Sequence, residues 1–414
     1  MKLKSISGCL AMLALALTFS GCVKDRITKT YRIYRPVMKS VADARAEIQS
    51  EASHLIKTPG KIFVKGNYIF LNEIDKGVHI IDNSNPAAPV TVSFINILGN
   101  QDIAVKGNIL YADQFTDLVT IDISNPLKAQ VKKILPAAFP ERTYANGVRP
   151  DGQNYITDYI WKDTTVEVVD PQVGFMPMNC INCMFSSVDR AGGAFASPTG
   201  IAGSTARFSL VNNTLYAVGT STLGTFSLSN PEEPRFIKRT SVGQNIETIF
   251  PLHDKLLMGS TSGVFIYDIQ TPEDPVRLSQ FSHVTACDPV VAQNNTAYVT
   301  LRSGARCSNA GNQLDILDIT SLSSPTLIKT YTLTNPKGLS IQNKLLFICD
   351  DGLKVFNAED PKNLKLIDHQ KGFESQDVIT LANLAIVVTK DGLLQYGYTS
   401  EGKLSLVGSK HWDN

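Results

Sequence analysis

GVHIIDNSNP, residues 77–86, is the first of several copies of one motif in this chain. In all copies but the last, a run of β-branched and apolar residues reaches an acidic or polar position, and most copies then continue into a turn that often contains Pro. The other copies are LVTIDISNP (118–126), VEVVDP (166–171), TFSLSNP (225–231), GVFIYDIQTP (263–272), LDILDIT (314–320), GLKVFN (352–357) and GLLQYG (392–397). Such internal repetition is typical of repeat architectures.

The spacing of the copies indicates the type of repeat. The position equivalent to Asp82 recurs at 122, 170, 227, 268, 318, 357 and 397, and four of the seven spacings lie between 39 and 41 residues. A period near 40 residues corresponds to one four-stranded propeller blade, and the longer spacings leave room for loop insertions.

Each repeat reads as four short strands. In the first repeat we predict strands at 61–64, 68–72, 78–82 and 90–95, because these β-branched and aromatic runs are too short for helices and are bounded by turn residues. Gly77 supplies the positive φ of a tight hairpin, and Pro86 prevents the third strand from continuing.

A single blade of this kind cannot bury both of its faces, whereas a closed ring of blades buries them and leaves only short edges. We therefore predict an all-β fold, a β-propeller of about eight four-stranded blades over residues 58–414. A ring of seven blades, with the unit around Asp170 as an insertion, is the alternative.

The N-terminus predicts export and a lipid anchor. Two lysines precede an apolar run, Leu10–Phe19, that is too short for a permanent membrane span. Small residues follow, and Phe19-Ser20-Gly21-Cys22 resembles a bacterial lipobox. We expect a signal peptide at 1–21, lipidation of Cys22 and a tether at 22–39; an ordinary secretory signal is the alternative. Val23 favours the outer membrane, while the periplasmic or surface face stays open.

Two further segments lie outside the repeats. Residues 40–57 are predicted to form a short helix that plugs or caps the ring, with Ser40 as its N-cap and Val41, Ala44, Ile48 and Leu55 near one face. Residues 172–206 lack a period and are predicted to be a long loop insertion, where function tends to lie.

Charge excludes one class of partner. The formal net charge is +1, so the chain has no long-range field to hold nucleic acid.

The predicted export makes the cysteines candidates for disulfides, because an oxidising compartment favours disulfide formation. We expect a disulfide between Cys287 and Cys307 that staples a loop insertion to its blade. Cys180 and Cys183 are expected to form a small loop disulfide, with a zinc half-site or a redox pair as alternatives. Cys349 lies in an apolar run and is predicted to be a buried free thiol.

Acidic residues begin several of the predicted inner strands. They are Asp102, Asp288 and Asp377, with Glu247 more loosely placed. Such a ring of carboxylates at one mouth of the axial channel could hold Ca²⁺, although the simpler reading is structural. No other cofactor and no further metal site is expected.

The repeat resembles the LVIVD family, named for its third-strand signature, which residues 119–122 and 316–318 carry best. The signal peptide, a Tyr-Arg segment and Ala-Cys-Asp-Pro at 286–289 resemble LVIVD-type lipoproteins of Bacteroidetes. The resemblance spans about residues 58–409 and implies the propeller fold; it implies no activity.

For function, the sequence favours a binding module over an enzyme. The six histidines share no repeat position, and H-x-E, H-E-x-x-H and G-x-S-x-G motifs are absent from the sequence. We predict a lipid-anchored, non-catalytic scaffold of the cell envelope that binds a protein or a glycan. The alternative is a propeller hydrolase or lyase that acts on an exported glycan in the central funnel.

Overall fold

The computed structural model describes residues 27–144, 148–168, 184–187, 206–282, 289–303 and 311–412. The chain divides into two compact units, one within residues 1–37 and 158–195 and the other within 38–157 and 196–414. The larger unit is an all-β propeller of seven four-stranded blades, and the smaller one is a three-stranded sheet.

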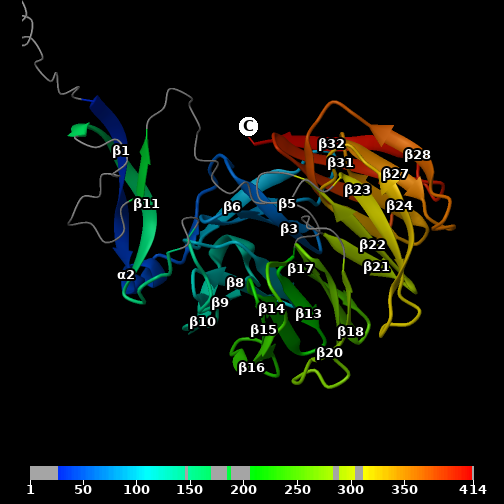
Figure 1. The fold of residues 1–414 in the computed structure, drawn as a ribbon, viewed down its shortest axis with the longest axis horizontal. Helices are drawn as coiled ribbons and strands as arrows, with labels where there is room; N and C mark the ends of the chain where they lie inside the picture. Colours follow the sequence, from blue (N-terminus) through cyan, green and yellow to red (C-terminus); the bar gives the residue numbers. More distant parts are fainter. Residues whose placement is uncertain are drawn as a thin grey trace, which may run out of the picture. The chain divides into compact units, whose positions relative to one another are not determined.

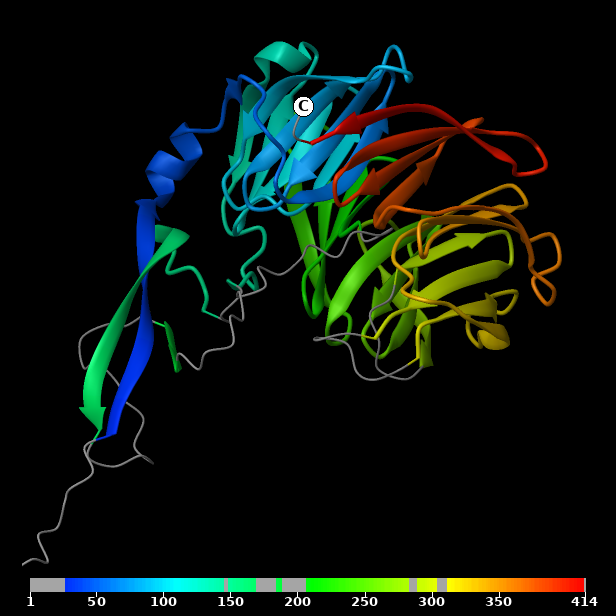
Figure 2. The same ribbon diagram turned by 90° about the horizontal axis from the view of Figure 1, so that it is seen from above.

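Each blade of the propeller is a meander of four consecutive antiparallel strands. The strands are β3 (Pro59–Lys65), β4 (Tyr68–Glu73), β5 (Gly77–Asp82) and β6 (Val90–Asn96) in blade 1; β7 (Ile103–Lys106), β8 (Ile109–Gln114), β9 (Asp117–Asp122) and β10 (Gln130–Leu135) in blade 2; β13 (Phe208–Val211), β14 (Thr214–Val218), β15 (Thr222–Ser227) and β16 (Arg235–Ser241) in blade 3; β17 (Ile246–Leu252), β18 (Lys255–Ser260), β19 (Gly263–Asp268) and β20 (Val276–Ser282) in blade 4; β21 (Val290–Gln293), β22 (Thr296–Leu301), β23 (Gln313–Asp318) and β24 (Thr326–Thr332) in blade 5; β25 (Leu339–Gln342), β26 (Leu345–Cys349), β27 (Leu353–Asn357) and β28 (Lys365–Gln370) in blade 6; and β29 (Ser375–Thr380), β30 (Leu384–Thr389), β31 (Gly392–Tyr398) and β32 (Leu404–His411) in blade 7. In Figures 1 and 2 these sheets follow one another round a common axis, and the red β32 returns to the blue strands of blade 1.

The repeated aspartate has a local structural role. Asp82, Asp122, Asp268 and Asp318 all end the third strand of their blade, and each accepts a 2.8 Å hydrogen bond from the backbone N–H two residues further on. This Asx turn redirects the chain towards the outer strand. The predicted equivalence of these four positions is confirmed, as are the four strands of the first repeat.

A β-bulge recurs between the third and fourth strands of every blade. In blade 1 it lies between Ile80 and Ile81, and in blade 7 between Gln395 and Tyr396. A bulge adds local twist to the strand that carries it. In blade 4 the third strand begins with Gly263, where only glycine fits. Its φ is 148°, and a Cβ there would lie 2.2 Å from the carbonyl oxygen of Phe281.

The core lies between neighbouring blades. The second and third strands are almost fully buried, whereas the outer strands are largely exposed. Hydroxyl groups add bonds from blade to blade, since Tyr111 Oη donates to the Pro231 carbonyl at 2.8 Å and Tyr216 Oη donates to the Pro272 carbonyl at 2.7 Å. The turn prolines thus provide acceptors for the preceding blade.

The ring closes without exchange of a strand. Blade 1 takes all four of its principal strands from the start of the propeller, and blade 7 takes all of its strands from the end. One apolar cluster joins the two blades, with Ile69 and Leu71 from blade 1 and Ile386 and Val388 from blade 7. Within it, Asn83 and Gln395 exchange reciprocal amide hydrogen bonds of 2.9 and 2.6 Å. Contacts made by side chains, rather than a shared strand, therefore hold blades 1 and 7 together at this seam.

The main prediction of eight blades is wrong, and the alternative of seven is correct. The motif that suggested an eighth blade, residues 166–171, overlaps the end of β11 (Asn154–Val168), a 15-residue strand. β11 pairs with β1 (Ile27–Ser40), and β12 (Met184–Ser187) pairs with the other edge of β1. Alternating β-branched residues suit any strand, so this copy of the signature carries no information about a blade.

The predicted N-terminal helix is also wrong for most of its length. Only α2 (Val41–Ala46) is helical, with the Ser40 hydroxyl as its N-cap. The chain then becomes extended, because β2 (Ser50–Glu51) pairs with β6 as a fifth strand of blade 1. Pairing with this sheet edge satisfies backbone groups that a longer helix would have satisfied internally. A single 3-10 turn, η2 (Pro126–Lys128), follows β9.

Several predicted features lie outside the described residues. They are the signal peptide with Cys22, the two cysteine pairs, Asp288 and nearly all of the 172–206 insertion. Within the described ranges, no helix is long and apolar enough to cross a membrane.

Candidate functional site

Charged side chains gather where the inner strands of the propeller begin. The first strands of successive blades contact one another round the ring, from β3 through to β29 and back to β3. Within two residues of the first residue of these strands lie six charged side chains, in blades 1, 2, 3, 4, 6 and 7: Lys61, Asp102, Arg207, Glu247, Lys337 and Asp377. The two signs of charge alternate in this order. We call these six residues the axial charges.

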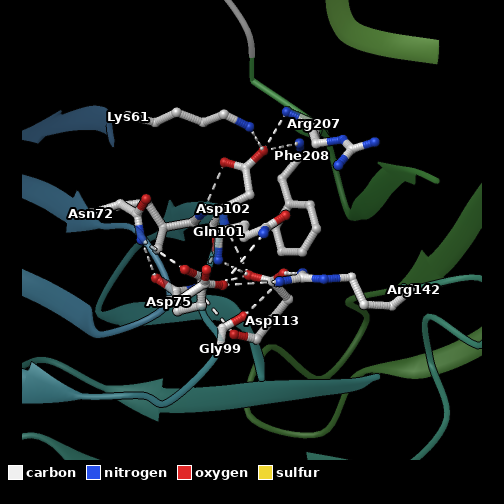
Figure 3. A network of polar contacts seen from close by, with 12 residues as sticks. Lys61, Asn72, Asp75, Gly99, Gln101, Asp102, Asp113, Arg142, Arg207 and Phe208 are labelled. Carbon is white, nitrogen blue, oxygen red and sulfur yellow. Dashed lines mark hydrogen bonds and ion pairs between the residues drawn. The ribbon is translucent and has the colours of Figure 1, made fainter. Parts of the chain in front are cut away.

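Asp102 is the most heavily bonded of the axial charges (Figure 3). Its Oδ2 accepts from Lys61 Nζ at 2.6 Å, from the Phe208 N–H at 3.1 Å and from the Arg207 N–H. Its Oδ1 accepts from the Ile103 N–H at 2.7 Å. Burial raises the pKa of Asp102 and lowers that of Lys61, and their ion pair opposes both shifts. The carboxylate thus joins blades 1, 2 and 3.

A second carboxylate, Asp113 at the end of β8, lies beneath Asp102 in the same network (Figure 3). Its Oδ1 accepts from Asn100 Nδ2 and the Gln101 N–H at 2.8 Å, and from the Asp102 N–H at 2.9 Å. Its Oδ2 accepts from Arg142 Nη1 at 2.6 Å. The side chains of Asp113 and Arg142 are only 7% and 13% exposed, so this is a buried ion pair whose other bonds are also satisfied.

Asp377 differs from these two carboxylates. It is 5% exposed, and Oδ1 accepts from the Val378 N–H at 2.7 Å. Burial raises its pKa to about 7, against the opposing effects of that N–H and the charge of Lys61. Burial thus favours the protonated form of Asp377.

The predicted acidic ring is thus only part of this region. Asp102, Glu247 and Asp377 lie at the starts of three inner strands, while Asp288 falls outside the described residues. Sequence reasoning missed the interleaved cations Lys61, Arg207 and Lys337, although Lys61 and Arg207 occupy the same repeat position as Asp102. Because Lys61 already balances Asp102, little negative charge is left there for an added cation, and calcium in this region stays a prediction.

A second polar cluster lies on blade 1, beside the first residue of β3, because Glu73 pairs with Pro59. Glu73 Oε2 lies 2.8 Å from His79 Nε2 and 3.1 Å from His54 Nε2. The ligand atoms of these three residues all lie within 4.8 Å of one another, so they could hold a metal ion. Sequence reasoning missed this cluster because the three residues fit no short motif.

Cys349 matches its prediction: it is a free cysteine, 1% exposed, and burial raises the pKa of its thiol. The candidate pairs Cys180–Cys183 and Cys287–Cys307 lie outside the described residues and stay predictions.

Comparison with protein families identifies the repeat. The LVIVD repeat matches residues 60–96, 100–133 and 308–333, which fall in blades 1, 2 and 5. The chain therefore contains LVIVD repeats within a β-propeller. No curated protein matches the chain.

Solved structures show the same fold at low sequence identity. A protein from Lactobacillus plantarum is 10% identical and aligns with a TM-score of 0.53 over 85% of this chain and 98% of its own. The computationally designed Ika8 protein is 8% identical, with a TM-score of 0.51 over 87% and 88% of the two chains. A complex of KlAtg21 with the coiled coil of AgAtg16 gives 10% identity and a TM-score of 0.51, over 86% and 99%. These similarities support the fold and carry no function.

Proposed function

We propose that this protein is a lipid-anchored propeller of the cell envelope that acts as a non-catalytic binding scaffold for a protein or glycan partner. The observation that carries the proposal is the hydrogen bonding of two buried carboxylates, Asp102 and Asp113. Asp102 and Asp113 each accept at least four hydrogen bonds from within the propeller. Groups held in this way stabilise the junction of blades and have little capacity left for a substrate.

The alternative function, a glycan hydrolase or lyase, needs acid and base groups that face the substrate. Most glycosidases use a pair of carboxyl groups, one on each side of the scissile bond. Asp377 is the residue that favours this alternative, since a pKa of about 7 suits a general acid. A second carboxylate free of internal partners would have to join it.

Exposed apolar side chains on the outer strands favour a protein over a glycan as the partner. Val276, Leu327, Leu366 and Leu406 are 55%, 48%, 53% and 60% exposed and belong to the outer strands of blades 4 to 7. Leu327, Leu366 and Leu406 occupy equivalent positions, each just before the unpaired bulge residue of its outer strand. Repeated apolar side chains on a surface are typical of protein contacts.

We expect a double variant, Leu366→Glu with Leu406→Glu, to lose the partner and keep its fold. Two carboxylates placed on this surface would be desolvated on binding, at a cost of more than about 2 kcal/mol, so retention should fall at least about 30-fold. The measurement is retention of an envelope protein from detergent-solubilised membranes on immobilised propeller, with the thermal midpoint recorded in parallel. Leu127→Glu, at an equally exposed leucine of blade 2, is the matched control.

Equal retention by the double variant and the wild type would contradict a binding role for this surface. Turnover of a glycan that disappears in Asp377→Asn would replace the scaffold proposal with the enzyme alternative.

The anchor gives a separate prediction. In Cys22→Ala we expect incorporation of labelled palmitate to disappear and the protein to move from the membrane pellet to the soluble fraction, because the thiol is the proposed acceptor of the lipid. Cys9→Ser is the control and should behave as wild type, since Cys9 leaves with the predicted signal peptide. Labelled, membrane-bound Cys22→Ala protein would exclude the lipoprotein proposal, and protease treatment of intact wild-type cells would assign the membrane face.

A further inference from the structure

Two strands and one loop build the polar cluster of blade 1. Glu73 is the last residue of β4 and His79 lies in β5, while His54 belongs to the segment between β2 and β3. Leu71 pairs directly with His79, and Glu73 is two residues beyond Leu71, so Glu73 and His79 lie on the same face of the sheet. That face also carries Ile69 and Ile81, which pack against blade 7. The cluster therefore lies on the side of blade 1 that faces the seam.

The positions of the donor atoms suit a transition-metal ion. In a tetrahedral zinc site with bonds of 2.0–2.1 Å, ligand atoms lie roughly 3.4 Å apart. Here Glu73 Oε2 lies 2.8 and 3.1 Å from the two imidazole nitrogens. To hold the ion, these two separations would have to lengthen by up to about 0.6 Å, and the two imidazole nitrogens, which lie within 4.8 Å of each other, would have to settle about 3.4 Å apart.

The ligands are already oriented. The other carboxylate oxygen, Glu73 Oε1, accepts from the Lys57 N–H at 2.9 Å. The rings of His54 and His79 lie against Phe94, with centroids at 4.3 and 4.6 Å, and against each other at 4.9 Å. Because these neighbours already hold the ligands in place, the ligands lose less conformational entropy when an ion binds.

Burial divides the cluster into a closed side and an open side. The side chains of Glu73 and His79 are 3% and 0% exposed, whereas that of His54 is 47% exposed. His54 thus provides an entry path, and an ion bound here would keep a fourth position towards solvent.

The hydrogen bonding within the cluster is shared and incomplete. Without an ion, one carboxylate oxygen serves both imidazoles, and the buried His79 Nδ1 has no hydrogen-bond partner among the described residues.

We propose that His54, Glu73 and His79 bind one divalent first-row transition-metal ion such as Zn²⁺. Two imidazoles and one carboxylate are a donor set for Zn²⁺, Cu²⁺ or Ni²⁺, whereas Ca²⁺ and Mg²⁺ require more oxygen ligands. The ion would fasten the segment before β3 to blade 1 beside the seam. Because His79 Nδ1 lacks an orienting acceptor, we expect an affinity roughly 10–100-fold below that of a site with a complete outer shell.

The test uses the full chain in detergent, without a histidine tag, and Zn²⁺ itself. We expect one Zn²⁺ per chain after equilibrium dialysis and a higher thermal midpoint with zinc. His54→Ala, at the exposed ligand, should weaken binding at least tenfold and remove the thermal shift, and Glu73→Gln should do the same. His253→Asn is the matched control: it replaces another exposed histidine and tolerates the φ of 53° at that turn.

Cobalt(II) gives a second readout, since an ion bound to these ligands absorbs in the visible range and His54→Ala should abolish the band. Failure of the wild type to bind zinc, or unchanged binding by both His54→Ala and Glu73→Gln, would overturn the proposal. Binding that persists in those variants and disappears in Cys180→Ser with Cys183→Ser would assign the ion to the cysteine pair and also overturn it.

Discussion

Replacing Asp113 with alanine is expected to lower the free energy of unfolding by about 3–5 kcal/mol, the usual cost of removing one partner from a buried ion pair. The substitution leaves Arg142 without its carboxylate in a site where its side chain is 13% exposed. It also removes the acceptor for the Gln101 and Asp102 N–H groups and for the Asn100 amide. Urea unfolding with linear extrapolation measures the change.

Asp113→Asn should cost nearly as much as the alanine variant. The asparagine keeps the shape of the carboxylate, but its NH₂ group would face either the Arg142 guanidinium or the backbone donors. Asp274→Ala, at an exposed carboxylate paired with Lys238, is the control and should leave stability almost unchanged. A loss of less than about 1 kcal/mol for Asp113→Ala would show that the network is not structural.

The second large effect is expected at the seam. Gln395→Leu should lower the free energy of unfolding by about 2–4 kcal/mol, because it leaves several buried polar groups without partners. Gln395 is fully buried, pairs with the amide of Asn83 and donates to the Pro86 carbonyl at 2.9 Å. Since no strand is shared between blades 1 and 7, we also expect blade 7 to become the first site of cleavage in limited proteolysis.

Tyr216→Phe is the matched control for the seam. It removes one hydrogen bond between blades 3 and 4, a junction away from the seam. The free energy of unfolding should fall by about 1 kcal/mol, and blade 7 should stay protected from proteolysis. If the two variants gave the same proteolytic pattern, the seam would be no weaker than any other junction of blades.

Local features could be predicted from the sequence. The first-repeat strands and the Asx turn at Asp82 depend on residues within about ten positions, so alternation and turn chemistry specify them. The same local basis explains the error in the blade count. Residues 166–168 form a strand as predicted, but that strand belongs to the sheet with β1 rather than to a blade.

Features of the candidate site depended on distant residues. Asp102 begins its strand as predicted, but its bond to Lys61 spans 41 positions, and two of its backbone donors, the Arg207 and Phe208 N–H groups, lie more than 100 positions away. A pattern of carboxylates at one repeat position therefore suggested an acidic ring, while the cations between them determine its charge. The His54 cluster was missed for a related reason, because a turn and a sheet pairing bring its members together.

The sequence by itself determined that a unit of about 40 residues folds as a sheet and that copies of it stack into a ring, because strand alternation and turns are short-range properties. Only the tertiary structure decided that seven units close the ring, that cations separate the axial carboxylates, and that Asn83 meets Gln395 across 312 positions. The number of blades that closes the ring depends on the twist and packing of all the blades together, and the sequence of one repeat does not determine it.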